Sequence, residues 1–278
     1  MIGTFAATLV AVGLGACTAY PTLNERTSLL APTMQYYAPD TAGRAPLVIL
    51  VSGCGGLNGL EGPKTVMRNY AMAATRGGAY AAVLDSFASR GIGFQDSVNT
   101  VCSGMRLHGN ERAGDILAAE ALARRHWNVD FSGIILAGWS HGGWTVMELL
   151  SSGPHASSIG GFRIDQASSA LKPDAVALYY PYCGFLNATG RSKWIFDGPL
   201  LYLNASSDAP AAGKECADVI RKARGDSVGL EQVDYPNTHA FDEEDQVPGS
   251  QFVYDAEATQ HSLALFERFV KDQTARLK

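Results

Sequence analysis

Short, unbroken runs of apolar residues recur along this chain, and they constrain its fold more than any other feature. A buried strand of a parallel sheet is apolar on both faces, so runs of this kind predict such strands. The runs lie at 47–51, 79–85, 133–138, 175–180 and 199–204, and residues 228–235 alternate as a sixth strand. Predicted helices lie at 61–76, 110–126, 141–150 and around Leu263, Phe266, Val270 and Leu277. The alternation predicts an α/β fold with a mostly parallel sheet and helices on both faces.

Composition limits the class of protein. The chain has 278 residues, 46% of them hydrophobic, which is enough for one sizeable core. No linker-like break interrupts residues 46–278, so we expect a single domain there. The net charge is −5 and no basic stripe occurs, which argues against a nucleic-acid-binding protein.

The N-terminus has the pattern of an export signal. Residues 5–14 are almost all apolar or small, and Leu14-Gly-Ala-Cys17 follows. The run is too short to span a bilayer and fits the apolar region of a signal peptide. Its end resembles a lipobox, although no Lys or Arg precedes Cys17. We expect residues 1–17 to be a signal peptide and Cys17 to be lipidated. Residues 18–45 are then a tether and irregular lead-in that holds an exported or periplasmic domain at a membrane. The alternative is a cytoplasmic chain whose apolar leader belongs to the fold.

The cysteine count supports export. Five cysteines are present, and lipidation of Cys17 leaves four, an even number suited to two disulfides in an oxidising compartment. Four cysteines allow three pairings. Position along the strands favours Cys54–Cys102 and Cys183–Cys216, and four reduced, buried cysteines are the alternative.

A candidate nucleophile follows the third predicted strand. Gly138-Trp-Ser140-His-Gly142 matches the pattern G-x-S-x-G, which alone is a weak signal in a chain with 30 glycines. The motif gains weight because it begins at the end of the apolar run 133–138 and enters a predicted helix. A sharp turn at that point exposes the serine hydroxyl above the carboxyl edge of the sheet.

A serine nucleophile needs a base, and the base needs a carboxylate that orients it. Where the serine lies on such a turn, the partners follow in the order acid, then histidine. Asp208 comes just after the fifth strand and His239 just after the sixth, so both lie at the edge where Ser140 emerges. The sequence predicts a Ser140, Asp208, His239 triad, with Asp242 as the next candidate for the acid.

The same chemistry requires two backbone N–H groups directed at the developing oxyanion. One is expected from His141, the residue after the nucleophile. The other is expected from the glycine-rich turn 52–56 after the first strand, with Cys54 as the donor by position. This turn is not followed by Gly-Lys-Ser/Thr, so a phosphate-binding P-loop is disfavoured.

Six stretches together resemble the dienelactone hydrolase family. They are VILVSGCGGLNG (48–59), YAAVLDSFASRG (80–91), Val101-Cys102, GWSHGG (138–143), YYPYCGF (179–185) and YPNTHAFD (235–242). The resemblance covers about residues 45–272 and implies the α/β-hydrolase fold with the Ser140, Asp208, His239 triad. The enzymes that give the family its name carry cysteine where this chain has Ser140, which favours an ordinary ester or lactone over dienelactone as substrate.

Two further residues are candidates for substrate contact. Arg90 lies in the matching stretch 80–91, and it would bind a substrate carboxylate or form a structural salt bridge with a nearby aspartate. Trp139 lies beside the nucleophile within the motif.

The predicted function is hydrolysis of a small carboxylic ester or lactone through an acyl-enzyme. A peptidase or thioesterase is an alternative on the same triad, because fold does not fix substrate. A catalytically silent lipoprotein that uses the fold as a binding scaffold is the alternative outside enzymes. We expect no metal and no cofactor, and the sequence does not predict an oligomeric state.

Overall fold

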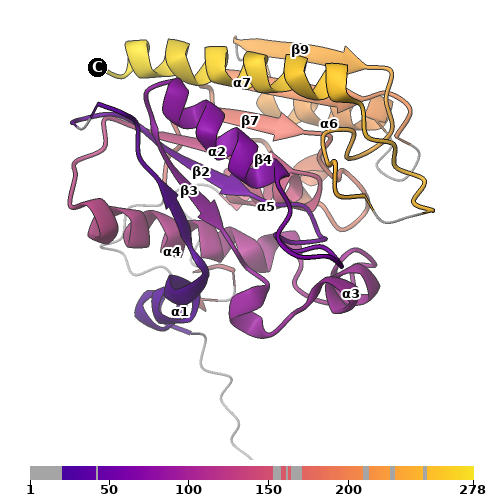
Figure 1. Ribbon diagram of the computed structural model, residues 1–278, viewed down its shortest axis with the longest axis horizontal. Coiled ribbons are helices and arrows are strands. Elements are labelled where there is room, and N and C mark those ends of the chain that lie inside the picture. Colours follow the sequence, from indigo (N-terminus) through magenta and orange to yellow (C-terminus); the bar gives the residue numbers. More distant parts are fainter. Residues whose placement is uncertain are drawn as a thin grey trace, which may run out of the picture.

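The computed structural model describes residues 21–41, 43–152, 158–160, 162–163, 171–208, 213–225, 229–246 and 249–278. Within these residues a twisted seven-stranded sheet has helices on both faces (Figure 1). The strand order is β1-β3-β2-β4-β7-β8-β9, and every pair is parallel except β1 with β3. The predicted α/β fold is therefore confirmed.

All six predicted strands are present. The strands of the sheet are β1 (Gln35–Tyr37), β2 (Leu47–Val51), β3 (Tyr80–Leu84), β4 (Ile134–Trp139), β7 (Ala175–Tyr179), β8 (Leu200–Ala205) and β9 (Leu230–Tyr235). Strands β2, β3, β4, β7 and β8 are buried along their whole length, as their apolar runs require. A separate two-stranded hairpin pairs β5 (Ser158–Ile159) with β6 (Phe162–Arg163).

The helices divide between the two faces of the sheet. One face packs against α1 (Leu23–Leu30), α4 (Gly109–Trp127), α5 (His141–Ser152) and α6 (Gly213–Arg224). The other packs against α2 (Val66–Arg76) and α7 (Ala256–Arg276). Short helical turns are α3 (Phe94–Asp96), η1 (Ala31–Thr33), η2 (Ala88–Arg90), η3 (Ser97–Val101) and η4 (Ala188–Arg191). No helix in the described part of the chain is long and apolar enough to span a bilayer.

The predicted tether 18–45 is wrong for its described part, because helix α1 and strand β1 belong to the domain. Thr22 and Glu25 form a capping box at the start of α1. Leu30 is fully buried in the core, and β1 extends the sheet beside β3. The packed domain therefore includes the chain from Thr22 onward, while the predicted signal peptide and Cys17 lie outside the described residues.

Candidate active site

Ser140 occupies a strained turn between β4 and α5, in the middle of the sheet. Its φ of 52° lies in the left-handed region that non-glycine residues rarely adopt. A Cβ on Gly138 would lie 2.5 Å from the Gly142 carbonyl oxygen, and a Cβ on Gly142 would lie 2.0 Å from the Val51 oxygen. The motif needs its glycines because this turn presses against both its own helix and the end of β2.

The structure brings the three residues of the predicted triad together at the carboxyl edge of the sheet. His239 Nε2 lies 2.7 Å from Ser140 Oγ, and His239 Nδ1 lies 2.5 Å from Asp208 Oδ2. The Asp208 side chain is buried and that of His239 nearly so. The three side chains form one continuous hydrogen-bonded chain, although the serine and the histidine are 99 residues apart in the sequence.

Aromatic side chains hold the His239 ring from two sides. The Tyr180 ring lies edge-on with its centroid 4.7 Å from that of His239, and the Phe252 centroid lies at 5.3 Å. Tyr180 is itself held in an uncommon backbone conformation, with φ of 33°, by a hydrogen bond from its N–H to the Leu203 carbonyl. These contacts fix the imidazole in the plane that joins Ser140 to Asp208.

The turn after β2 lies directly beside the serine. A Cβ placed on Gly53 would be 3.5 Å from the Ser140 Cβ. Cys54 and His141, the two predicted oxyanion donors, both line the pocket that opens at Ser140. The turn after β2 and the start of α5 therefore border the same pocket at Ser140.

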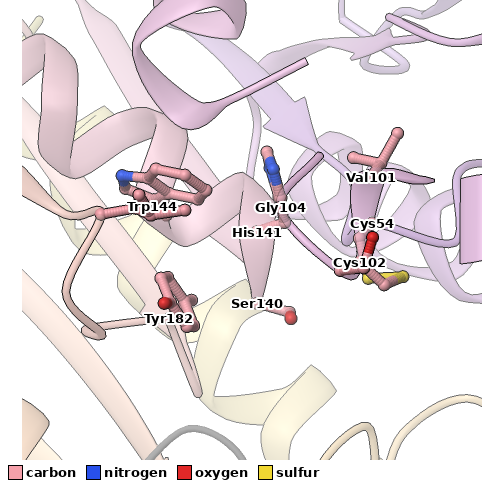
Figure 2. A pocket seen from close by; sticks show the side chains of 10 residues that line it. Cys54, Val101, Cys102, Gly104, Ser140, His141, Trp144 and Tyr182 are labelled. Atoms are coloured by element: carbon pink, nitrogen blue, oxygen red, sulfur yellow. A yellow bond between two sulfur atoms is a disulfide. The ribbon is translucent and has the colours of Figure 1, made fainter. Parts of the chain in front are cut away.

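The pocket at Ser140 is small, about 100 Å³. Figure 2 shows the Cys54–Cys102 disulfide on one side of Ser140 and Trp144 with Tyr182 on the other. Val101, Ser103, Gly104 and Leu186 complete the lining. Apolar and aromatic side chains make up much of the lining, and two of the lining residues, Cys54 and Cys102, are joined by a disulfide.

Both predicted disulfides are present. Cys54 and Cys102 are bonded with Cα atoms 5.1 Å apart, and Cys183 and Cys216 with Cα atoms 5.3 Å apart. The first closes a sequence separation of 48 residues and joins the turn after β2 to the end of η3. The second joins the loop after β7 to helix α6, and neither of its cysteines is among the residues that line the pocket.

Asp242, the second candidate for the acid, belongs to a different network. It accepts hydrogen bonds from the Tyr70 hydroxyl at 2.7 Å, from the Trp139 indole at 3.1 Å and from the Tyr180 hydroxyl. Burial raises the pKa of the Asp242 carboxyl, and these three donors oppose the shift. The structure thus pairs His239 with Asp208, and Asp242 lies on the side of the sheet covered by α2 and α7.

The two predicted substrate contacts are not found. Arg90 makes two hydrogen bonds to Asp115, of 2.8 and 3.0 Å, and a third to the Ser86 carbonyl, which is the salt-bridge alternative. Trp139 is 1% exposed and stacks on Tyr179 in the core. Side chains alternate across a strand, so the residue before Ser140 points to the opposite face from the pocket.

Sequence reasoning missed Arg112, which lies behind the pocket. Its guanidinium donates from Nη1 to His141 Nδ1 at 3.0 Å and from Nη2 to the Ser52 carbonyl at 3.0 Å. Burial lowers the pKa of Arg112 to about 10, so the side chain remains cationic at neutral pH. Burial and the Arg112 charge hold the pKa of His141 well below its usual range, so that ring is neutral. An arginine inside a helical segment gives no sequence signal of burial, since most arginines are exposed.

No group of three or more His, Cys, Asp or Glu side chains in the described part of the chain is arranged to hold a metal ion.

Comparison with models of known families gives no match to the sequence. Comparison with curated protein sequences gives no match either.

Solved structures, by contrast, match over most of the chain. A thermophilic esterase from Thermogutta terrifontis is 16% identical with a TM-score of 0.60, over 86% of this chain and 89% of its own. A carboxylesterase from Lactobacillus plantarum is 18% identical with a TM-score of 0.56, over 86% and 91%. A dienelactone hydrolase-like promiscuous phosphotriesterase from metagenomic libraries is 16% identical with a TM-score of 0.55, over 86% and 91%. These similarities show that the chain has the α/β-hydrolase fold.

Proposed function

We propose that the protein is a serine hydrolase that cleaves a small carboxylic ester or lactone through an acyl-enzyme. The observation that carries the proposal is the continuous chain from Ser140 Oγ through the His239 imidazole to Asp208. A serine hydroxyl is a weak nucleophile at neutral pH, and a histidine held by a carboxylate is the group that activates it.

Each residue has a defined step in this reaction. Ser140 Oγ attacks the ester carbonyl carbon while His239 Nε2 takes its proton, and the carbonyl oxygen becomes an oxyanion near the N–H groups of Cys54 and His141. His239 then gives the proton to the departing alcohol, which leaves the acyl group on Ser140. Water then attacks the acyl carbon while His239 takes its proton. The return of that proton to Ser140 Oγ breaks the acyl bond and releases the carboxylic acid. Asp208 keeps its negative charge and holds His239 Nδ1–H throughout.

The size and lining of the pocket favour a small acyl or lactone group. The cavity of about 100 Å³ beside Ser140 is bounded by Trp144, Tyr182 and a disulfide, which suits a small group next to the nucleophile. The esterases and the dienelactone hydrolase-like enzyme among the structural neighbours support an ester over an amide.

The proposal is tested with purified protein, a panel of short acyl esters, lactones, thioesters and peptide amides, and a fluorophosphonate probe. We expect ester or lactone turnover and covalent labelling of Ser140. The variants Ser140→Ala and His239→Ala should each lose activity by about 10⁴-fold or more while remaining folded. His261→Ala is the matched control, because His261 lies on α7, hydrogen-bonded to Tyr235, and should keep activity.

Other outcomes identify the alternatives. Faster turnover of amides or thioesters would make the protein a peptidase or a thioesterase on the same triad. No labelling and no turnover in a folded protein would favour the alternative of a catalytically silent protein that uses the fold as a binding scaffold.

We also propose that the domain is exported and anchored through a lipid on Cys17. The two disulfides support an oxidising compartment. The wild type should partition into detergent and a Cys17→Ala variant should not, because acyl chains contribute about 0.8 kcal/mol per buried methylene to membrane binding. A mature protein that begins at Met1 would contradict this proposal and favour the cytoplasmic alternative.

A further inference from the structure

Arg112 presents an unusual electrostatic situation. Its side chain is fully buried, yet both of its hydrogen-bond acceptors are neutral, the His141 ring and a backbone carbonyl. Its Nε is buried and has no hydrogen-bond partner among the described residues. A buried cation without a direct counter-charge is costly, and buried charges are ordinarily paired.

The neighbouring carboxylates do not provide the missing pair. Asp115 is bonded to Arg26 and to Arg90, and Asp85 accepts from the backbone N–H groups of Phe87 and Ala88. Both carboxylates act on Arg112 only through space. The Phe87 ring lies 4.7 Å from the guanidinium carbon and covers that side of the cation.

The two acceptors of Arg112 are the residues that flank the proposed oxyanion hole. Ser52 is two residues before Cys54 in the turn after β2, and His141 carries the other proposed N–H at the start of α5. The same two segments press against each other, because a Cβ on Gly142 would lie 2.6 Å from the Ser52 oxygen. One planar guanidinium on α4 thus bonds both halves of the site at once.

We infer that Arg112 is a positioning residue for the oxyanion hole: it holds the turn after β2 and the start of α5 in register, and its positive charge lies next to both segments. The inference rests on the proposed function, since it assigns a part in the same reaction. A cation whose counter-charge is absent in the resting enzyme is matched when the carbonyl oxygen becomes negative. Arg112 therefore stabilises the transition state more than the bound substrate, so its replacement should lower kcat and leave KM nearly unchanged.

The test compares Arg112→Gln and Arg112→Lys with Arg26→Gln. Fluorophosphonate labelling, carried to completion, counts the folded sites in each preparation, and kcat is expressed per labelled site. Arg112→Gln removes the charge and one of the two donors, and we expect kcat to fall about 100-fold with KM changed less than threefold, the size of effect seen when an oxyanion donor is lost. The rate of labelling should fall with kcat, because that reaction also passes through a developing anion.

Arg112→Lys keeps the charge in case the neutral variant does not fold. An ammonium lacks the planar pair of donors, so it cannot hold both segments in the same way, and we expect a loss of about 10-fold. Arg26→Gln is the matched control. Arg26 is also a buried arginine, and it bonds Asp115 and the carbonyls of Glu111 and Gly160, so its kcat per labelled site should be that of the wild type.

Three results would overturn the inference: kcat per labelled site within threefold of wild type in both Arg112 variants, a loss confined to KM, or an equal loss in Arg26→Gln. Failure of the proposed function is distinguishable from these, because the wild type itself would then show neither turnover nor labelling at Ser140.

Discussion

Ser140 lies between two regions that are built in different ways. On one side, the base side (His239 and Asp208), side chains from the loops after β8 and β9 bond directly to one another. On the other, the oxyanion side (residues 52–54 and His141), the groups proposed to act are backbone amides. Those amides are held by a buried cation and by the Cys54–Cys102 disulfide.

The difference shows where the structural demands of this site lie. A reactive side chain can reach its place from a loop if one or two hydrogen bonds orient it. A backbone N–H has no such freedom and must be placed by the whole segment that carries it. The oxyanion side therefore requires support from outside the loop itself, and Arg112 and Cys102 provide contacts of that kind.

The largest expected effect is the loss of kcat when the acid on the base side is replaced. Asp208→Asn should lower kcat by about 10⁴-fold, because the amide favours the wrong tautomer of His239. Asp242→Asn is the comparison, a buried carboxylate bonded to Tyr70, Trp139 and Tyr180 that reaches His239 only through the Tyr180 ring, so its kcat per active site should fall far less than that of Asp208→Asn. If Asp208→Asn kept more than about a tenth of wild-type activity, the acid would be misassigned.

A smaller effect would separate the two disulfides. Replacing Cys54 and Cys102 together by serine should destabilise the fold by about 4 kcal/mol in the chain-entropy model and lower kcat about 10-fold or more, because the turn that carries the proposed donor is released.

The control is the pair Cys183→Ser with Cys216→Ser, whose separation of 33 residues predicts nearly the same loss of stability. Neither of these cysteines lines the pocket, although Cys183 follows the lining residue Tyr182, so activity per active site should fall less than in the Cys54, Cys102 double variant. Urea unfolding and active-site titration measure both quantities. Equal activity in the two double variants would contradict a specific role of the Cys54–Cys102 bridge in supporting the oxyanion side.

The base side could be predicted from the sequence more fully than the oxyanion side. Apolar runs predicted the strands, and the order serine, aspartate, histidine predicted the base side, because both signals are carried by residue type. Strand β1 was missed because three residues without an apolar run give no period. Helix α1 was missed although Thr22 and Glu25 offered a capping signal. Arg112 was missed because only packing distinguishes a buried arginine from an exposed one.

The smallest effect concerns the neutral ring on the oxyanion side. Burial and the Arg112 charge lower the folded-state pKa of His141, while the unfolded value stays near 6.5. The unfolded chain then binds more protons than the folded protein as pH falls below about 6.5. The contribution of His141 to the unfolding free energy is therefore fully present above that pH and is lost below it.

Between pH 7.5 and 5.5 the wild type should lose more unfolding free energy than His141→Gln, whose side chain does not titrate, by an amount on the order of 1 kcal/mol. Denaturant titrations at both values measure the difference. Parallel losses in the two proteins would show that His141 is protonated in the folded state.

The pairing of α2 with α7 has a consequence for how the chain folds. The Tyr70 hydroxyl lies 2.7 Å from Ser262, 192 residues further along, so one face of the sheet is covered by two helices that lie far apart in the sequence. Contacts between such distant segments form slowly. A nascent chain that has already made β2, β4 and Ser140 still lacks His239 and the cover for α2, so the enzyme we propose would acquire its activity only after His239 and α7 have been made.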